Sequence, residues 1–214
     1  MSTTLIINAH PQYDSKSSFS MQVLDHFWKM YKESNPNETI EQVTLYRDYI
    51  PALDSTVLGA WEKLSKDEPL SLNEEKITTR MSEVVRQFKR AKKYIIAMPL
   101  HNFNVPSKLK DYMDNVLIAR ETFKYTEDGS GSVGLLKDGR SVLVIQGSGG
   151  FYTNDDWYAE VEYSNKYLKS MFYCMGIEDY NIIRAQGTAV LNPEELLKTA
   201  YLEVEEAVSY LSKV

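Results

Sequence analysis

The chain is poor in cysteine and contains no long hydrophobic run. Its single cysteine, Cys174, excludes an intrachain disulfide framework and any metal cluster built from several cysteines. No stretch of the sequence approaches the roughly 18 apolar residues that a membrane-spanning helix requires. The amino-terminal segment MSTTLIINAHP has no basic region before its apolar run, so we expect no secretion signal. These absences predict a reduced, cytoplasmic protein that does not enter a membrane.

Positive charge is also scarce. The 24 Lys and Arg residues face 30 Asp and Glu residues, and the net charge of −6 argues against a nucleic-acid partner. The basic pairs Lys89-Arg90 and Lys92-Lys93 are expected to form a solvated face, with attraction of an anionic cofactor as the alternative. Hydrophobic residues at 43% and charged residues at 25% are ordinary for a globular domain and exclude disorder. With no linker or repeat in 214 residues, we predict one domain over residues 1–214.

Short apolar runs alternate along the chain with longer segments of helical periodicity. The apolar runs predict five strands, at residues 4–9, 39–45, 94–99, 141–146 and 180–185. Apolar residues at helical spacing predict five helices, at residues 19–30, 71–88, 109–116, 163–174 and 192–211. Outside this alternation, we expect residues 51–69 to be irregular and residues 122–135 to be a turn-rich insertion.

The connections between these strands are too long for hairpins, and strands alternate with helices. This pattern predicts an α/β fold: a doubly wound, five-stranded parallel sheet in the order 2-1-3-4-5, with helices on both faces. In such a sheet, ligands bind outside the carboxyl ends of the strands, where the strand order reverses. Three loops of unusual composition leave those ends, at residues 10–20, 99–106 and 147–152. They predict one site built from three segments.

The first loop is rich in hydroxyl groups, with Ser15, Ser17, Ser18 and Ser20 placed directly before a predicted helix. A helix N-terminus presents unpartnered N–H groups and a partial positive charge, and serine hydroxyls add further donors. An ordinary N-cap explains any one of these serines, but the segment as a whole favours a phosphate-binding loop.

The second and third loops have the composition of a ring-binding surface. Residues 99–106 combine backbone amides, the Phe103 ring and two asparagine side chains, which suits a flat heteroaromatic ligand. Residues 147–150 are Gly-Ser-Gly-Gly, and glycine lets the backbone approach a ligand closely. We expect the third loop to contact a ring edge, because the first loop provides for the phosphate. Each loop taken alone also fits an ordinary turn.

Several other site classes lack their motifs in this sequence. The absence of G-x-x-x-x-G-K-[ST] and G-x-G-x-x-G disfavours a Walker A site and a classical Rossmann loop. The absence of G-x-S-x-G disfavours a hydrolase, and no paired carboxylates accompany the histidines as a phosphodiesterase would need. His10 and His101 would meet above the sheet, but without a carboxylate partner in their loops they argue against a metal site.

The three loops, in this order, resemble those of the FMN-dependent NADH-azoreductases, members of the flavodoxin-like quinone reductase group. The likeness covers nearly the whole chain, and residues 51–61 also look familial. The matching segments are Asn8-Ala9-His10-Pro11, residues 98–106, Thr122-Phe123-Lys124-Tyr125-Thr126 and residues 145–152.

The resemblance implies FMN bound at the interface of a homodimer, NADH or NADPH as electron donor, and quinones or azo compounds as acceptors. It implies that Phe123 and Tyr125 cover the ring or the acceptor slot. The phosphate contacts that it implies come from His10, Ser17, Ser18 and Ser20, with Ser15 as an alternative in the same loop. The ring contacts that it implies come from Leu100, His101, Asn102, Phe103, Gly147, Ser148, Gly149 and Gly150.

The sequence departs from the family pattern at two places. His101 stands where members often have Trp or Tyr, which leaves the acceptor preference open. Gly147-Ser148 stands where some members have Arg beside the glycines, which leaves the choice between NADH and NADPH open.

We hypothesise a two-step, ping-pong cycle in which a nicotinamide passes a hydride to FMN and leaves, and the acceptor then takes the hydride equivalent in the same slot. The flavin carries this chemistry, so no catalytic acid–base pair is required, although His101 is a candidate proton donor. The 15 tyrosines favour a two-fold dimer, since aromatic residues are enriched at interfaces. The alternative is a flavodoxin-type electron carrier without its own NAD(P)H oxidation. The segments 51–69 and 122–135 argue against it, because a minimal carrier needs neither.

Overall fold

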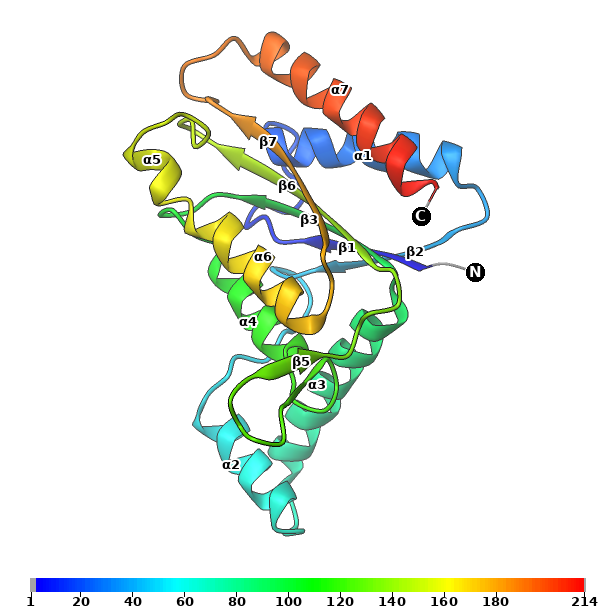
Figure 1. Ribbon diagram of the computed structural model, residues 1–214, viewed down its shortest axis with the longest axis vertical. Helices are drawn as coiled ribbons and strands as arrows, with labels where there is room; N and C mark the ends of the chain where they lie inside the picture. Colours follow the sequence, from blue (N-terminus) through cyan, green and yellow to red (C-terminus); the bar gives the residue numbers. More distant parts are fainter. Residues whose placement is uncertain (1–2, 214) are drawn as a thin grey trace.

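A computed structural model describes residues 3–213 of the chain. Its centre is a five-stranded sheet in the order β2-β1-β3-β6-β7, with every neighbouring pair parallel (Figure 1). The five strands are β1 (Thr3–Asn8), β2 (Thr39–Thr44), β3 (Lys93–Pro99), β6 (Ser141–Ser148) and β7 (Asp179–Gln186). The predicted strands, their order and the parallel, doubly wound architecture are therefore confirmed. The single-domain prediction runs over residues 1–214, of which the first two and the last lie outside the described residues.

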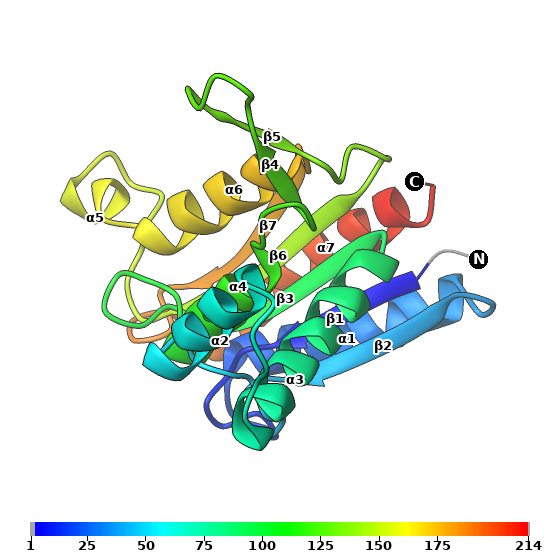
Figure 2. The ribbon, with the colours of Figure 1, turned by 90° about the horizontal axis from the view of Figure 1, so that it is seen from below.

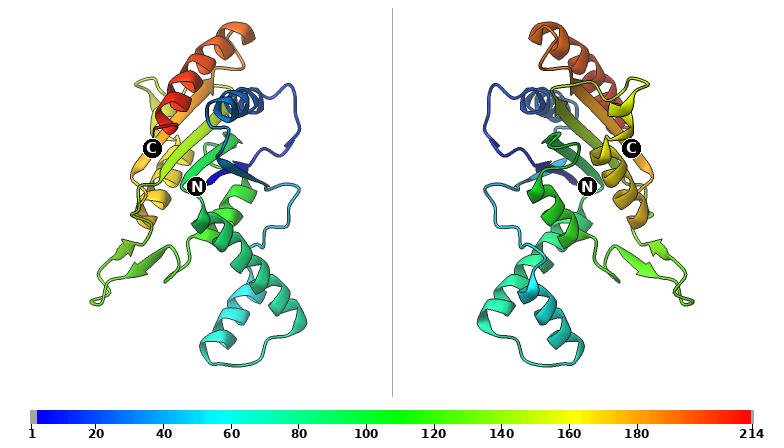
Figure 3. Two further views of the ribbon diagram at one scale, coloured as in Figure 1. Left: turned by 90° about the vertical axis from the view of Figure 1, so that its right-hand side faces the viewer. Right: turned by 90° about the vertical axis from the view of Figure 1, so that its left-hand side faces the viewer.

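Helices cover both faces of the sheet, and a small hairpin stands apart from it. The helices are α1 (Phe19–Ser34), α2 (Ser55–Ser65), α3 (Leu72–Arg90), α4 (Ser107–Val116), α5 (Trp157–Glu160), α6 (Tyr163–Met175) and α7 (Pro193–Leu211). The hairpin consists of β4 (Phe123–Tyr125) and β5 (Ser132–Gly134). The hairpin and the α2–α3 pair extend from the same side of the sheet, away from α1 and α7 (Figure 3).

Alternation of side chains along the buried strands divides the core into two layers. In β1, Ile6 packs into the layer formed with α1 and α7, whereas Leu5 and Ile7 pack into the layer formed with α3, α4 and α6. β3 is apolar and buried over most of its length, with Ile95 and Ile96 fully covered on opposite faces. The central strands are thereby held in place, and their carboxyl ends meet at one edge.

The helix ends follow the signals in the sequence. Ser71 and Glu74 form the capping box that begins α3, with both reciprocal hydrogen bonds present. Asn192 caps α7 by accepting from two backbone N–H groups ahead of Pro193. Gly176 ends α6 at φ +91°, in the left-handed region where glycine carries no steric penalty.

The expectation that residues 51–69 are irregular is wrong, because they contain the eleven-residue helix α2. Asp54 caps α2 by accepting from the Val57 N–H at 3.0 Å, and α2 packs along α3. Only Val57 and Ala60 are buried in this helix, so its apolar stripe is too short to be recognised as helical. The predicted insertion at residues 122–135 contains the β4–β5 hairpin.

The expectation of a solvated face before β3 is wrong for Lys93. Its side chain is only 5% exposed, and its ammonium group lies 3.2 Å from the equally buried carboxylate of Glu38. The Tyr31 hydroxyl donates to the same carboxylate at 2.8 Å. The other three basic residues form exposed ion pairs, as expected for a solvated face.

Among residues 3–213, every helix is too short or too polar to cross a lipid bilayer.

Candidate cofactor-binding site

A cavity of about 320 Å³ opens at the carboxyl ends of β1, β3 and β6. Segments from all three predicted loops line it, which brings together residues far apart in the sequence. Nine predicted site residues lie on its wall: His10, Ser17, Ser18, Ser20, Leu100, His101, Gly147, Ser148 and Gly149. The alternative phosphate contact, Ser15, lies there as well.

The serines surround the N-terminus of α1 and bond to one another. Ser18 is the N-cap residue, and its hydroxyl lies 3.2 Å from that of Ser20. In the described part of the chain, the Ser18 side chain forms no capping hydrogen bond to the first turn. Instead, its backbone N–H donates to the Ser15 hydroxyl oxygen at 3.1 Å. The first-turn N–H groups and several hydroxyls are thus available to an anion.

His10 is held in a fixed orientation at the rim of this cavity. Its Nδ1 accepts the Gln12 backbone N–H at 3.0 Å, so the proton of the neutral ring lies on Nε2. Burial lowers the pKa of His10, and the neighbouring His101 lowers it further. His10 and His101 therefore do meet above the sheet. Residues 3–213 contain no third His, Cys, Asp or Glu placed to complete a metal site with them.

Gly147, near the end of β6, lies against the first turn of α1. A Cβ atom at this position would lie 3.3 Å from the Ser20 Cβ and 3.4 Å from the Ser20 nitrogen. Such contacts are tighter than nearly all real Cβ contacts. The absence of a side chain at Gly147 therefore lets the serine-rich loop and the glycine-rich loop close on the same cavity.

The second loop is a tight turn with two successive left-handed residues, Asn102 at φ +46° and Phe103 at φ +65°. His101 and Asn104 exchange backbone hydrogen bonds at 3.0 and 2.9 Å across it. This is the backbone of a hairpin turn that favours Asn and Gly, and an aromatic residue in the left-handed region costs about 1–2 kcal/mol. The Leu100 N–H ties the start of the loop to the Gly147 carbonyl at 2.7 Å.

Three predicted ring contacts lie beside the cavity rather than on its wall: Asn102, Phe103 and Gly150. The Phe103 ring instead packs edge-on against Trp157, with centroids 5.4 Å apart, and also meets Tyr152 and Tyr158. Trp157 is 57% exposed, so this aromatic group forms part of the surface next to the cavity.

Of the other four lining residues, Gln12, Phe19 and Pro99 belong to the predicted loops, and sequence reasoning missed Thr188. Thr188 follows β7, and its N–H donates to the Ser148 carbonyl at 3.1 Å. The predicted strand order indicates this position, because β7 adjoins β6 and the residues that follow its carboxyl end must lie at the same edge of the sheet.

Phe123 and Tyr125 lie far from this cavity in the same chain. They belong to the β4–β5 hairpin, which is fixed to the C-terminal end of α6 by a 2.9 Å hydrogen bond from the Leu136 N–H to the Met175 carbonyl. α6 begins near the cavity and has 13 residues, a length of about 20 Å. The hairpin stands out from the rest of the molecule beside α6 (Figure 2). Tyr125 is 68% exposed there.

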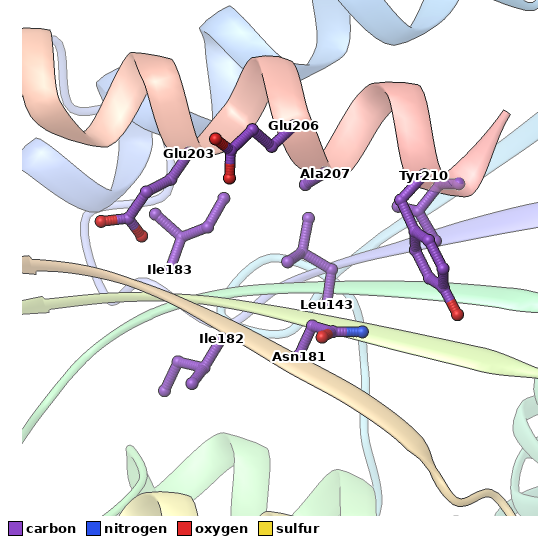
Figure 4. A pocket seen from close by; sticks show the side chains of 9 residues that line it. Leu143, Asn181, Ile182, Ile183, Glu203, Glu206, Ala207 and Tyr210 are labelled. Atoms are coloured by element: carbon purple, nitrogen blue, oxygen red, sulfur yellow. The ribbon is translucent and has the colours of Figure 1, made fainter.

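A second hollow, of about 260 Å³, lies between β7 and α7 (Figure 4). Its floor is apolar, and Glu203 and Glu206 stand at its rim. Burial raises the pKa of Glu203. The predicted site residues all lie elsewhere, so the cavity at the carboxyl ends of the strands is the candidate cofactor site.

Comparison with known proteins agrees with this geometry. The family described as having a flavodoxin-like fold matches residues 2–208. An FMN-dependent NADH:quinone oxidoreductase 1 of Bacillus cereus (strain ZK / E33L) is 65% identical over 213 residues, covering 99% of both chains. This chain belongs to that oxidoreductase family. A relative of the same name from Lactiplantibacillus plantarum is 42% identical, over 97% of both chains.

A solved structure matches this chain over nearly its whole length. It is the crystal structure of an FMN-dependent NADH-azoreductase from Bacillus anthracis in complex with FMN. The two chains are 64% identical and superpose with a TM-score of 0.96, covering 99% of this chain and 100% of the other. The resemblance found in the sequence is therefore confirmed.

Proposed function

We propose that this protein is an FMN-dependent NADH:quinone oxidoreductase that also reduces azo compounds. The observation that carries the proposal is the convergence of three separated loops on one cavity at a helix N-terminus. The names of the relatives, which are similar over nearly their whole length, support the same activity.

The residues of the first loop fit the phosphate of FMN. The N-terminus of α1 supplies N–H donors and a partial positive charge, and the hydroxyls of Ser17, Ser18 and Ser20 supply further donors. His10 presents its Nε2–H as a donor, because its Nδ1 is already an acceptor. This loop therefore binds and orients the anionic end of the cofactor.

The second and third loops fit the ring of FMN. Leu100, His101, Gly147, Ser148 and Gly149 form one wall, where the glycines let a flat ring approach the backbone closely. Asn102, Phe103 and Gly150 lie beside this wall, in the same two loops. FMN held here would supply the hydride chemistry between NADH and the acceptor, and the loops would orient its ring.

The protein supplies positions rather than a catalytic acid–base pair. We infer that the donor and the acceptor occupy the same exposed side of the cavity in turn, which gives ping-pong kinetics. His101 is exposed at this side and is available to pass a proton, although solvent reaches the same position.

We further propose that the protein is a homodimer and that the hairpin of each subunit serves the cavity of its partner. Phe123 and Tyr125 lie too far from their own cavity to cover it, yet Tyr125 projects from the surface with its ring exposed. The α2–α3 pair presents Leu58, Leu64 and Leu72, which are more than half exposed. A second copy would cover these apolar groups. We also propose a cytoplasmic location without a membrane partner. The net charge of −6 supports the absence of a nucleic-acid partner.

The test begins with the purified apo-protein and added FMN. We expect quenching of flavin fluorescence with one FMN bound per chain, and parallel double-reciprocal plots when NADH and a quinone are varied. Failure to bind FMN would refute the proposal. Light scattering at micromolar concentration should give the mass of two chains, and a mass of one chain would refute the dimer alone.

A further inference from the structure

A buried carboxylate outside the cavity connects two of the loops that form it. Glu162 is the N-cap residue of α6, but its side chain turns toward the sheet and is 6% exposed. The Arg184 guanidinium donates to both of its oxygens, from Nε and Nη2, at 2.8 Å each. Gln146 of β6 donates its amide N–H to Oε1 at 2.8 Å. Glu162 therefore links β6, β7 and the start of α6.

The same network reaches the second loop through Ser164. The Ser164 hydroxyl donates to the Gln146 amide oxygen at 2.7 Å, so the Gln146 side chain is held at both ends. The Ser164 backbone N–H donates to the Phe103 carbonyl at 3.2 Å. Gln146, Glu162 and Ser164 are all at most 5% exposed. Water is thus in no position to replace these hydrogen bonds.

The segment that this network holds lies directly beside the cavity wall and has a strained backbone. Asn102 and Phe103 both have positive φ values, a conformation that persists only when the surroundings impose it. Backbone hydrogen bonds join this segment to the rest of the protein at both ends. The Leu100 N–H donates to the Gly147 carbonyl, and the Phe103 carbonyl accepts from the Ser164 N–H. Gln146 directly precedes Gly147 and is hydrogen-bonded to both Ser164 and Glu162. Both ends of the segment are therefore connected to Gln146 and, through it, to Glu162.

We propose that Glu162 is a positioning residue for the cofactor, which sets the His101–Asn104 turn against the Gly147–Gly149 segment through Gln146 and Ser164. The inference rests on the proposed function, because it names a residue that controls the same site. Glu162 itself does not line the cavity.

The test compares Glu162→Gln with Glu38→Gln. Glu38 offers a matched control, since its carboxylate is 8% exposed and is bound by Lys93 at 3.2 Å and by the Tyr31 hydroxyl at 2.8 Å. It lies at the amino end of the sheet, beside Thr4 and Lys93. Glu162→Gln leaves the partly buried Arg184 without its charged partner, and Glu38→Gln leaves the buried Lys93 without its own, so both variants should lower the melting temperature of the apo-protein.

Only Glu162→Gln should act on the cofactor site. We expect its FMN dissociation constant to rise by about tenfold, the size expected when a charge-assisted hydrogen bond is lost. In the apo-protein, hydrogen exchange should accelerate at Asn104 and Ser164. The Glu38→Gln protein that remains folded should bind FMN within about twofold of the wild type.

Ser164→Ala provides a second variant if Glu162→Gln does not fold, because it keeps the charges paired and should show a smaller effect in the same direction. An FMN dissociation constant within twofold of wild type in both site variants would overturn the inference. Equal weakening of FMN binding by Glu38→Gln would also overturn it, by showing a general loss of stability. If the wild-type protein itself does not bind FMN, the proposed function fails first.

Discussion

A Cβ atom on Gly147 would lie 3.3 Å from the Cβ of Ser20, so the end of β6 rests closely on the first turn of α1 and a side chain there would force a small shift. We predict that Gly147→Ala pushes the two loops apart. Its unfolding free energy should fall by about 1 kcal/mol, a typical cost of overpacking, and its affinity for FMN should fall with it. Chemical denaturation of the apo-protein and a flavin titration measure the two effects.

Gly149→Ala is the matched control for this change. A Cβ at Gly149 meets only the Ala189 Cβ, at 3.8 Å, which is an ordinary contact. The stability of this variant should stay within about 0.5 kcal/mol of wild type. Equal stability losses at Gly147 and Gly149 would show that the approach to Ser20 is not what matters.

Ser18→Ala should separate cofactor binding from helix capping. The Ser18 hydroxyl makes no capping bond within the described residues, so its loss should leave the melting temperature of the apo-protein unchanged. The affinity for FMN should fall by about tenfold if the hydroxyl donates to the phosphate. By contrast, Asp54→Ala removes a real cap from α2 and should cost about 1 kcal/mol without weakening FMN binding. A destabilised Ser18→Ala protein with normal affinity would contradict this prediction.

Gly134→Ala should detach the β4–β5 hairpin from α6. A Cβ on Gly134 would lie 2.2 Å from the Gly176 backbone nitrogen, an overlap that no side-chain movement relieves. We expect FMN binding to persist in this variant, with loss of the dimer and of acceptor reduction. Gly131→Ala is the control, because a Cβ there meets nothing within 4 Å. Light scattering and steady-state kinetics would distinguish the two variants, and unchanged assembly of Gly134→Ala would count against a role for the hairpin.

The ionisation of His10 should make the apo-protein less stable at mildly acidic pH. Burial lowers the pKa of His10 below its usual value of 6.5, so below that pH the unfolded chain binds a proton that the folded protein resists. Stability should therefore be complete above about pH 6.5 and decline as the pH falls toward the folded pKa. The pKa of His26 is lowered by burial too, so His10→Asn should remove only part of this dependence.

Proton NMR checks this prediction directly, since the chain has only three histidines to assign. A pKa for His10 at or above 6.5 in the apo-protein would contradict it. Denaturation between pH 8 and pH 5.5 stays above the range in which carboxylates ordinarily titrate, and the comparison of wild type with His10→Asn isolates the contribution of His10.

The central sheet could be predicted because its signals are local. β3 is a continuous apolar run, as a strand covered on both faces must be, and the interval between strands demands a helical crossover. The meeting of the three loops then follows from parallel strands alone, which end at one edge of the sheet. Ser18, Leu100 and Gly147 could therefore be assigned to one site without knowledge of any contact between them.

What could not be predicted depends on partners far away in the sequence. Lys93 is buried because Glu38, 55 residues earlier, comes to lie beside it, and no local pattern announces such a pair. α2 exists because it packs on α3, although the Asp54 cap was a usable signal. The displacement of Phe123 and Tyr125 from their own cavity arises from the length of α6, which depends on tertiary placement rather than composition.

The His101–Asn104 turn, with its two left-handed residues, affects the free-energy cost of ligand binding. Because the crossing hydrogen bonds and the two ties at its ends already fix the turn in the free protein, a ligand finds its binding surface preorganised and need not spend association energy on ordering that loop. At position 103 a glycine would relax the backbone of the turn, but it would lose the packing of the Phe103 ring on Trp157.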